Sequence, residues 1–297
     1  MTLQSSILMA NPSSPRIAFT IVHYNAPQAV ALLLNDLLQQ DQSACILDIV
    51  VADNGPTQSA LAEVIREYKD RPSVRFEVMP RNLGYYGAAQ VVLDNIWRRD
   101  LPEWVIVSNA DIHIPSKDFC SRLAGYGNTF PVIAPAIISG FTGRDQNPFK
   151  YRRPSAWSMH LKRLLRRVEI LARLIESQYS LKQNLRRAGL LGSRLSGSSS
   201  PLPVYAAHGS FIAFNRTYFQ RGGTLKARAF LFAEEIFVAE SCRRLRLPIM
   251  YCQGIHVVHS EHAATKASST TRAFEAAAAD YCALHYFPLW KRTQDIK

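Results

Sequence analysis

Apolar and polar positions between residues 16 and 111 follow a pattern that predicts strands alternating with helices. A mostly apolar run at residues 16–25 predicts a buried strand, and Pro27 then stands where the first turn of a helix tolerates proline. The same pattern predicts further strands at 47–54, 74–80 and 104–111, and helices at 27–40, 59–70 and 85–99. Such alternation is typical of a parallel sheet with helices on both faces.

This alternation stops at about residue 139. Residues 158–191 place apolar side chains at helical spacing with Arg and Lys on the other face, and 192–203 form a linker rich in Ser, Gly and Pro. Regular structure then resumes with an apolar stretch at 204–219, a helix at 234–246, a strand at 248–259 and a helix at 271–287. The sequence therefore predicts an α/β fold with a smaller second half and a basic helical insertion.

The net charge of +12 first suggests a nucleic-acid partner, but its distribution changes that interpretation. Between Arg144 and Arg194 there are thirteen Lys and Arg against three acids, a local charge of +10. A basic amphipathic segment, placed at residues 150–195, suits an anionic membrane surface. The alternative is a helical hairpin that packs on the core or on a second subunit, so a homo-oligomer stays open.

Cysteine usage and the first residues bear on the cellular compartment. The chain has five cysteines, an odd number with no C-x-x-C pair, which favours buried thiols in a reduced intracellular protein. Residues 1–15 read as a flexible leader without the features of a signal peptide, and no window approaches the ~18 apolar residues of a membrane span. We expect a cytoplasmic protein, either soluble or peripheral on the inner face of the plasma membrane.

Polar residues gather where the first four predicted strands end. They are His23, Tyr24, Asn25, Asp53, Asn54, Arg81, Asn82, Asn109 and Asp111. In open α/β sheets, ligands bind beyond the carboxyl ends of the strands, so these ends predict a binding rim. Each residue alone is also an ordinary turn residue.

Glycine motifs and the acid at the fourth strand end narrow the chemistry. Neither a G-x-G-x-x-G fingerprint nor a P-loop occurs, which argues against a dinucleotide dehydrogenase or a P-loop kinase. Gly84 and Gly87 in "RNLGYYGAAQ" permit a close backbone approach or a tight turn. Asp111 can hold Mg²⁺ or Mn²⁺ against a diphosphate, or it can simply cap a turn.

The second half adds two carboxylates and a histidine to these candidates. Glu234 and Glu235 stand side by side at a predicted helix start, where acids are favoured electrostatically, but one of them can also act as a general base. His256 is expected to be a core residue of the strand. His259 falls at the end of that strand, where an imidazole can complete a metal or phosphate site.

Taken in order, seven short motifs resemble those of one enzyme family. They are "IVHYN", "VVADN", "NLGYYGAA", "VIVSNADI", "HGSFIAFNRTYF", "FLFAEEIFVAE" and "HVVHSEHAAT". The sequence resembles family 2 of the inverting glycosyltransferases, which have the GT-A fold, and more narrowly the bacterial surface-polysaccharide branch with rhamnosyltransferase-like members. The likeness covers roughly residues 16–140 and 203–290. It implies a nucleotide-sugar-binding half at 16–140, a basic insertion at 141–202 and an acceptor half at 203–297.

This resemblance implies roles for individual residues. The donor-binding residues would be Tyr24, Asn25, Asp53, Asn82, Gly84 and Asn109, of which Asn109 replaces the first acid of the family's metal motif. Asp111 and His259 would hold Mg²⁺ or Mn²⁺, Glu235 with Glu234 would supply the base, and His208, Gly209 and Ser210 would lie on the acceptor side. The implied reaction moves a sugar from a nucleoside diphosphate sugar to a hydroxyl of a glycan or lipid-linked glycan in O-antigen, capsule or related synthesis.

Two other functions compete with this interpretation. A non-enzymatic membrane or nucleic-acid adaptor would use the basic insertion, but acids at the strand ends would repel a polyanion, and no nucleic acid is expected. A sugar nucleotidyltransferase would need a Gly-rich basic loop after the first strand, where this chain has "HYNAPQ".

Overall fold

The structure, a computed structural model, describes residues 14–55, 58–167, 200–261 and 269–289. The predicted leader therefore lies almost wholly outside the described residues. So do most of the predicted insertion helix beyond residue 167 and most of the predicted linker. Within the described ranges, no helix has the length and apolar character that crossing a bilayer requires.

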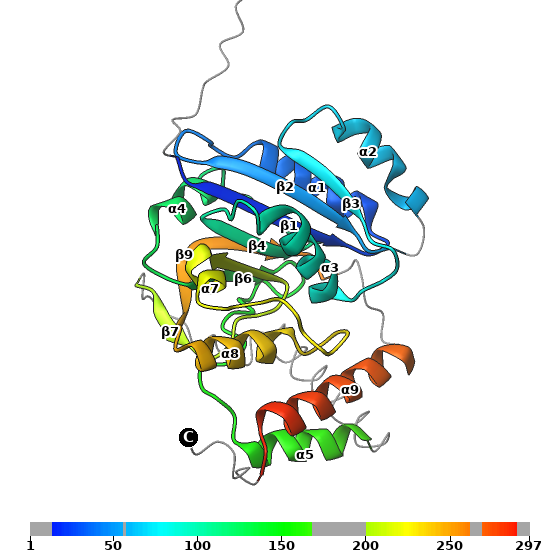
Figure 1. The fold of residues 1–297 in the computed structure, drawn as a ribbon, viewed down its shortest axis with the longest axis vertical. Helices are drawn as coiled ribbons and strands as arrows, with labels where there is room; N and C mark the ends of the chain where they lie inside the picture. Colours follow the sequence, from blue (N-terminus) through cyan, green and yellow to red (C-terminus); the bar gives the residue numbers. More distant parts are fainter. Residues whose placement is uncertain (1–13, 56–57, 168–199, 262–268, 290–297) are drawn as a thin grey trace, which may run out of the picture.

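The first half is the predicted parallel sheet. Strands β1 (Arg16–His23), β2 (Ile46–Asp53), β3 (Val74–Val78) and β4 (Trp104–Asn109) lie in the order β3-β2-β1-β4, and each adjacent pair is parallel. The connections contain α1 (Pro27–Leu38), η1 (Gln58–Leu61), α2 (Ala62–Tyr68), α3 (Tyr85–Val92) and η2 (Leu93–Trp97). Figure 1 shows these elements as the blue-to-green part of the ribbon.

The second half continues the same sheet with mixed pairing. Its strands are β8 (Phe211–Asn215), β6 (Val132–Ser139), β9 (Ile249–His259), β5 (Ile112–His113) and β7 (Leu202–Val204). β8 is antiparallel to both β4 and β6, whereas β6 and β9 are parallel. Its helices are α4 (Phe119–Gly125), α7 (Arg216–Gln220), α8 (Glu234–Leu245), α5 (Ala156–Arg167) and α9 (Ser269–Tyr286). The predicted α/β class is confirmed, and β6 and α4 are additions that the sequence pattern did not predict.

Alternating side chains of the strands fill two separate cores. In β1, Phe19 and Ile21 pack in one core with α1, α2 and α4, whereas Ala18 and Val22 face the other core with α3 and α8. This two-residue period is that of a strand buried on both sides. All five cysteines are buried and free, which confirms their interpretation as ordinary thiols.

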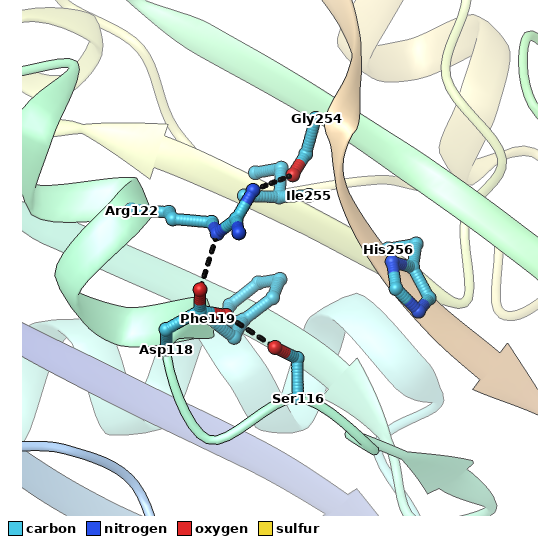
Figure 2. A pocket seen from close by; sticks show the side chains of 7 residues that line it. All are labelled: Ser116, Asp118, Phe119, Arg122, Gly254, Ile255 and His256. Carbon is cyan, nitrogen blue, oxygen red and sulfur yellow. Dashed lines mark hydrogen bonds and ion pairs between the residues drawn. The ribbon is translucent and has the colours of Figure 1, made fainter.

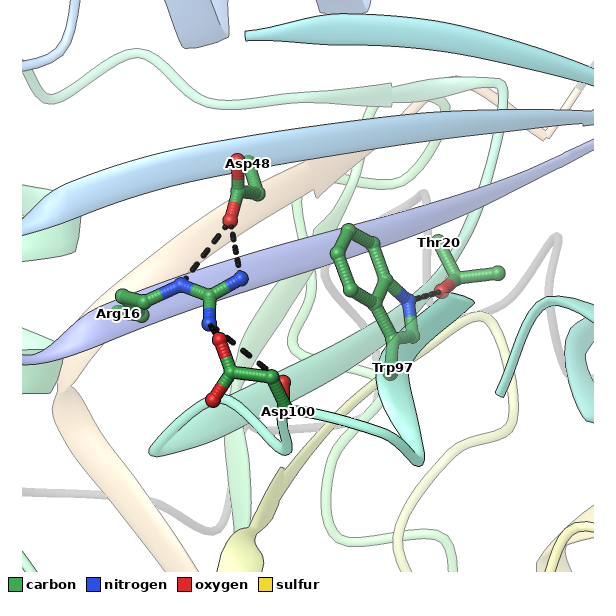
Figure 3. A network of polar contacts seen from close by, with 5 residues as sticks. All are labelled: Arg16, Thr20, Asp48, Trp97 and Asp100. Carbon is green, nitrogen blue, oxygen red and sulfur yellow. Dashed lines mark hydrogen bonds and ion pairs between the residues drawn. The ribbon is translucent and has the colours of Figure 1, made fainter. Parts of the chain in front are cut away.

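Polar contacts fix the amino end of β1, opposite the predicted binding rim (Figure 3). Arg16 Nη2 lies 2.8 Å from Asp48 Oδ2 on β2, and the same guanidinium bonds Asp100. Trp97 is buried and donates its indole N–H to Thr20 Oγ1 at 3.0 Å. To reach that position, the helix predicted to residue 99 changes at Leu93 into a π-helical turn.

Candidate active site

The register of the parallel strands brings the predicted rim together. His23 at the end of β1 is opposite Asp53 of β2, and Val22 is opposite Asn109 of β4. Asp53 is in turn opposite Val78 at the end of β3. The four strand ends are therefore neighbours along one edge, as the sequence predicts.

Asp53 and His23 form a buried pair at this edge. Asp53 Oδ1 lies 3.1 Å from His23 Nδ1 and accepts a hydrogen bond from Gly55 N–H at 3.1 Å. His23 Nε2 accepts from Ala26 N–H, so Nδ1 carries the hydrogen that the carboxylate accepts. Burial lowers the pKa of His23, although Asp53 opposes the shift. Among the described residues, Asp53 Oδ2 is buried with no hydrogen-bond partner, an acceptor suited to a ligand's donor.

Other predicted donor-side residues have different roles in the local structure. Tyr24 and Asn25 are exposed after β1, and Asn25 has a left-handed φ of 51°. Asn82 is engaged inside its own loop, because its Oδ1 accepts from Asn54 Nδ2 and Gly84 N–H, both at 2.9 Å. Gly84 has φ 75°, and a Cβ there would lie 2.2 Å from the carbonyl oxygen of Phe230. Gly84 therefore lets the segment before α8 approach the start of α3.

Asp111 and His259 meet because of a short antiparallel ladder. β5 pairs with β9 so that Ile112 is opposite His259, and Asp111 C=O accepts from Ser260 N–H at 2.9 Å. The carboxylate Oδ1 of Asp111 consequently lies 3.3 Å from His259 Nε2. His259 Nδ1 lies 2.9 Å from Gln146 Oε1, an acceptor, so Nδ1 donates its hydrogen there. In a neutral imidazole, Nε2 then presents its lone pair toward Asp111.

Asp111 and His259 fit a divalent cation whose other ligands are oxygens of a diphosphate. A carboxylate oxygen and an imidazole lone pair facing each other need a proton or a cation between them. The described residues contain no group of three or more His, Cys, Asp or Glu able to hold a metal. Cations such as Mg²⁺ are commonly bound by one or two carboxylates together with substrate phosphates. Two protein ligands are therefore enough only when the substrate completes the coordination.

The segment His208–Ser210 lies next to the end of β4 and to His259. β4 and β8 pair so that Ser108 is opposite Phe211, and Ser210 C=O accepts from Asn109 N–H at 2.8 Å. The His208 ring is 5.8 Å from the His259 ring, and His208 Nδ1 is 2.9 Å from Ser210 Oγ. Burial and the neighbouring His259 lower the pKa of His208 to about 4.

The two adjacent glutamates begin α8 and differ in what they contact. Glu235 Oε1 accepts from Gly209 N–H at 3.3 Å, and a Cβ on Gly209 would come within 3.1 Å of that oxygen. Burial raises the pKa of Glu235, while the charge of Lys150 opposes the shift. Burial and the charge of Glu235 raise the pKa of Glu234 to about 8, with backbone N–H groups at 232–234 opposing. Glu235 is the carboxylate that faces the predicted acceptor segment.

Tyr85 lies near both Asp111 and the two glutamates. It is the first residue of α3, and its hydroxyl donates to Ser210 C=O at 3.4 Å. Burial and the negative charges of Glu234, Asp111 and Glu235 raise the pKa of Tyr85 well above its ordinary value. One phenol thus lies in the field of all three acids, so the acids share one region of the molecule.

Three residues near these acids are absent from the sequence prediction. Gln146 orients His259, and Tyr85 lies among the acids. The positive charge of Lys150 opposes the rise in the pKa of Glu235. Tyr85 stands within the "NLGYYGAA" motif, so a signal was present there. Gln146 and Lys150 lie in the predicted insertion and follow no strand or helix pattern that would mark them.

His256 is not the core residue that the sequence predicts. Because residues of β9 alternate in burial, His256 is exposed while Ile255 and Val257 are buried. Its side chain lines a surface pocket between β9 and the start of α4 (Figure 2). There, Arg122 Nε bonds Asp118 Oδ2 at 2.6 Å, and Arg122 Nη1 donates to Gly254 C=O at 3.3 Å. These groups satisfy one another, and the pocket contains none of the predicted site residues.

The raised pKa of Glu234 predicts a pH-dependent stability. The folded chain keeps this proton up to a pH of about 8, whereas an unfolded chain releases it near 4.5, the ordinary value for a glutamate. Since the folded state binds more protons in this window, its stability falls as pH rises. For each pH we take the free energy of unfolding of Glu234→Gln minus that of wild type. We expect this difference to be more positive at pH 8 than at pH 5 by on the order of 1–3 kcal/mol. Urea unfolding at both values measures this, and an equal difference at both would contradict it.

Comparison with solved structures identifies the class of fold. The chain is similar to the structure of GalNAc-T7 with UDP, GalNAc and Mn²⁺, with TM-score 0.57, 12% identity and coverage of 84% of this chain but 44% of that one. It is also similar to the mannosyltransferase PcManGT from Pyrobaculum calidifontis in complex with GDP-Man and Mn²⁺, with TM-score 0.50, 14% identity and coverage of 92% and 71%. At these identities the likeness shows the fold, which is the predicted GT-A type.

The family follows from the sequence. The sequence model of the family described as glycosyl transferase family 2 matches residues 19–187, which is more than half of the chain. The chain therefore belongs to this family. No curated protein matches the chain. The chain spans less than half of the length of the GalNAc-T7 chain that it resembles.

Proposed function

We propose that the chain is an inverting glycosyltransferase that moves a sugar from a nucleoside diphosphate sugar to a hydroxyl of a glycan or lipid-linked glycan. The observation that carries this proposal is that Glu235 and Asp111 both lie near His208–Ser210, with Tyr85 in the field of both acids. Family membership and the solved neighbours, whose complexes contain UDP or GDP-Man with Mn²⁺, support it. We place it in bacterial surface-polysaccharide synthesis, in the rhamnosyltransferase-like branch.

On the donor side, the nucleoside would lie along the ends of β1 and β2. Asp53 Oδ2, buried and without a protein partner among the described residues, would accept a hydrogen bond from the base or ribose. Tyr24 and Asn25, exposed beside it, would line the same place, while Asn82 and Gly84 shape the loop that leads into α3. Residues 16–140 would thus form the nucleotide-sugar-binding half, and residues 203–297 would form the acceptor and catalytic half.

The diphosphate would lie toward Asp111, His259 and Asn109. A divalent cation, Mg²⁺ or Mn²⁺, supplies positive charge for the leaving diphosphate when it is bound. Asp111 and His259 would hold it, and Gln146 would keep the imidazole in the required tautomer. Asn109 would contribute an amide instead of a second carboxylate.

Glu235 would take the proton of the attacking hydroxyl. Because burial raises its pKa, the carboxylate is a stronger base than an exposed one. Its contact with Gly209 N–H fixes the carboxylate beside the segment proposed to hold the acceptor. Attack from the face opposite the diphosphate in one displacement inverts the anomeric configuration. Glu234 would keep its proton up to a pH of about 8, so that Glu235 carries the negative charge of the pair.

A donor screen tests this proposal. We expect one UDP-, dTDP- or GDP-sugar to release its nucleotide in the presence of Mn²⁺ or Mg²⁺ and an acceptor glycan, and to stop when the cation is chelated. Nuclear magnetic resonance of the product would show inverted anomeric configuration. Release of no nucleotide from any donor would refute transferase function, whereas a retained configuration would refute the single displacement.

A further inference from the structure

Helix α5 presents a stripe of large apolar side chains to solvent. Trp157 is 77% exposed, Leu161 56% and Leu164 58%. Residues separated by four and then three positions lie on one face of a helix, so these three form one continuous strip, here called the α5 stripe. Contiguous exposed apolar surface of this kind marks an interaction site rather than ordinary surface.

The other side of α5 is fixed to the rest of the protein. Met159 is buried in a small core with residues of α8 and α9. Arg163 Nε bonds Asp280 Oδ1 at 2.8 Å, and His160 Nε2 lies 3.0 Å from Phe287 C=O. Figure 1 shows α5 beside α9 at the end of the molecule farthest from β3. α5 therefore packs on the rest of the chain, as one form of the sequence-based alternative expects of the insertion. Among the described residues, this packing leaves the α5 stripe exposed.

The charge of α5 distinguishes between two kinds of partner for the α5 stripe. α5 contains four Lys and Arg, of which Arg163 is paired with Asp280 of α9, and no Asp or Glu. Residues 144–167 together carry eight basic residues against one acid. A second copy of the same surface would bring like charges together, which opposes self-association. Tryptophan and leucine next to Lys and Arg are instead the combination that enters the headgroup boundary of an anionic bilayer.

We propose that the α5 stripe docks on an anionic lipid surface, with Trp157, Leu161 and Leu164 in the headgroup boundary and the basic residues near lipid phosphates. The binding itself does not depend on the proposed transferase function.

A short strap connects this surface to the acceptor segment. Asn147 Oδ1 accepts from His208 N–H at 2.7 Å, and Lys150 N–H donates to Ala206 C=O at 3.1 Å. α5 begins six residues after Lys150. Docking of α5 would therefore hold the His208–Ser210 segment close to lipid, a consequence that rests on the proposed function and suits a lipid-linked acceptor.

Vesicle binding tests the proposal on the full chain. We expect wild type to co-sediment with vesicles of phosphatidylcholine containing about 30% phosphatidylglycerol, and to bind pure phosphatidylcholine at least ~10-fold more weakly. The double variant Leu161→Glu/Leu164→Glu should lose at least ~10-fold in binding to the anionic vesicles. Leu32→Glu is the matched control, because Leu32 is 67% exposed on α1 and carries the same substitution away from the stripe. It should bind as wild type does.

Tryptophan fluorescence supplies a second measurement at the stripe itself. Of the four tryptophans, Trp97 and Trp104 are buried, Trp157 is exposed and Trp290 lies outside the described residues. In a Trp290→Phe background, vesicle binding should therefore shift the emission of Trp157 to the blue, and Trp157→Phe should abolish the shift. Equal binding by the double variant and Leu32→Glu would overturn the proposal. So would vesicle-free dimers, seen by light scattering, that the double variant loses, or binding to RNA in preference to vesicles. Nucleotide release assayed without vesicles distinguishes failure of docking from failure of the proposed transferase function.

Discussion

Glu235→Gln should lower the turnover number by at least ~100-fold while leaving donor binding nearly unchanged, because general-base catalysis typically contributes about 10²–10⁴-fold. Glutamine keeps the shape of the side chain and can still accept from Gly209 N–H. It cannot take a proton from an acceptor hydroxyl. Initial rates of nucleotide release at saturating donor and acceptor measure the effect, and the donor KM separates catalysis from binding.

Two matched variants sharpen this result. Glu63→Gln makes the same change in the first turn of α2, on an exposed residue, and should turn over as wild type. Glu234→Gln should lose far less activity than Glu235→Gln, because the neighbouring backbone N–H groups already interact with Glu234. A larger loss for Glu234→Gln would reverse the assignment of the two glutamates, and normal turnover of both would exclude either as the base.

The pH profile follows from the same environment. Burial raises the pKa of Glu235, so the carboxylate takes up a proton at a higher pH than an exposed glutamate. Because the base must be unprotonated to act, we expect activity to fall as pH drops through that raised pKa. Lys150→Met removes the positive charge that opposes the shift, so the acidic limb of the profile should move to higher pH. If the acidic limb did not move, it would not report the ionisation of Glu235.

The fold was predictable where the hydrophobic period is unambiguous. The four parallel strands and their helices follow from apolar runs that end in turn residues, and the gathering of the strand ends at one edge follows from parallel pairing. β6 escaped prediction because Pro135 lies inside its apolar run, and proline argues against a central strand. The structure tolerates Pro135 at a register shift between Pro135 and Ala136 against β9.

Some residues of the candidate site could be predicted from the sequence, and others could not. Asp53 and Asp111 stand at predicted strand ends, where the sequence period alone indicates a position on the rim. Glu235 stands at a predicted helix start, and its candidacy as a base comes from the paired acids and the family resemblance. Gln146 reaches His259 only because its segment folds back along β6, where Gln146 N–H donates to Ile137 C=O at 2.8 Å. Contacts of that kind depend on tertiary register, which a local pattern does not encode.

Asp111→Asn should reduce kcat/KM by at least ~100-fold, equivalent to about 2.7 kcal/mol of transition-state stabilisation. The substitution removes one of the two side chains proposed to hold the cation and leaves the β5–β9 ladder intact, because Ser260 N–H bonds the backbone of Asp111. Asp70→Asn, on an exposed residue after α2, makes the same change of charge and should behave as wild type.

Binding measurements separate the role of Asp111 in holding the cation from any structural role. Calorimetry with Mn²⁺ and a nucleoside diphosphate, without acceptor, should show at least ~10-fold weaker cation binding for Asp111→Asn and a smaller loss for Gln146→Leu, which only orients His259. Since the protein alone offers two ligands, wild type should bind Mn²⁺ weakly without the nucleotide and tightly with it. Tight binding without nucleotide, or unaltered binding by Asp111→Asn, would contradict a site that the substrate completes.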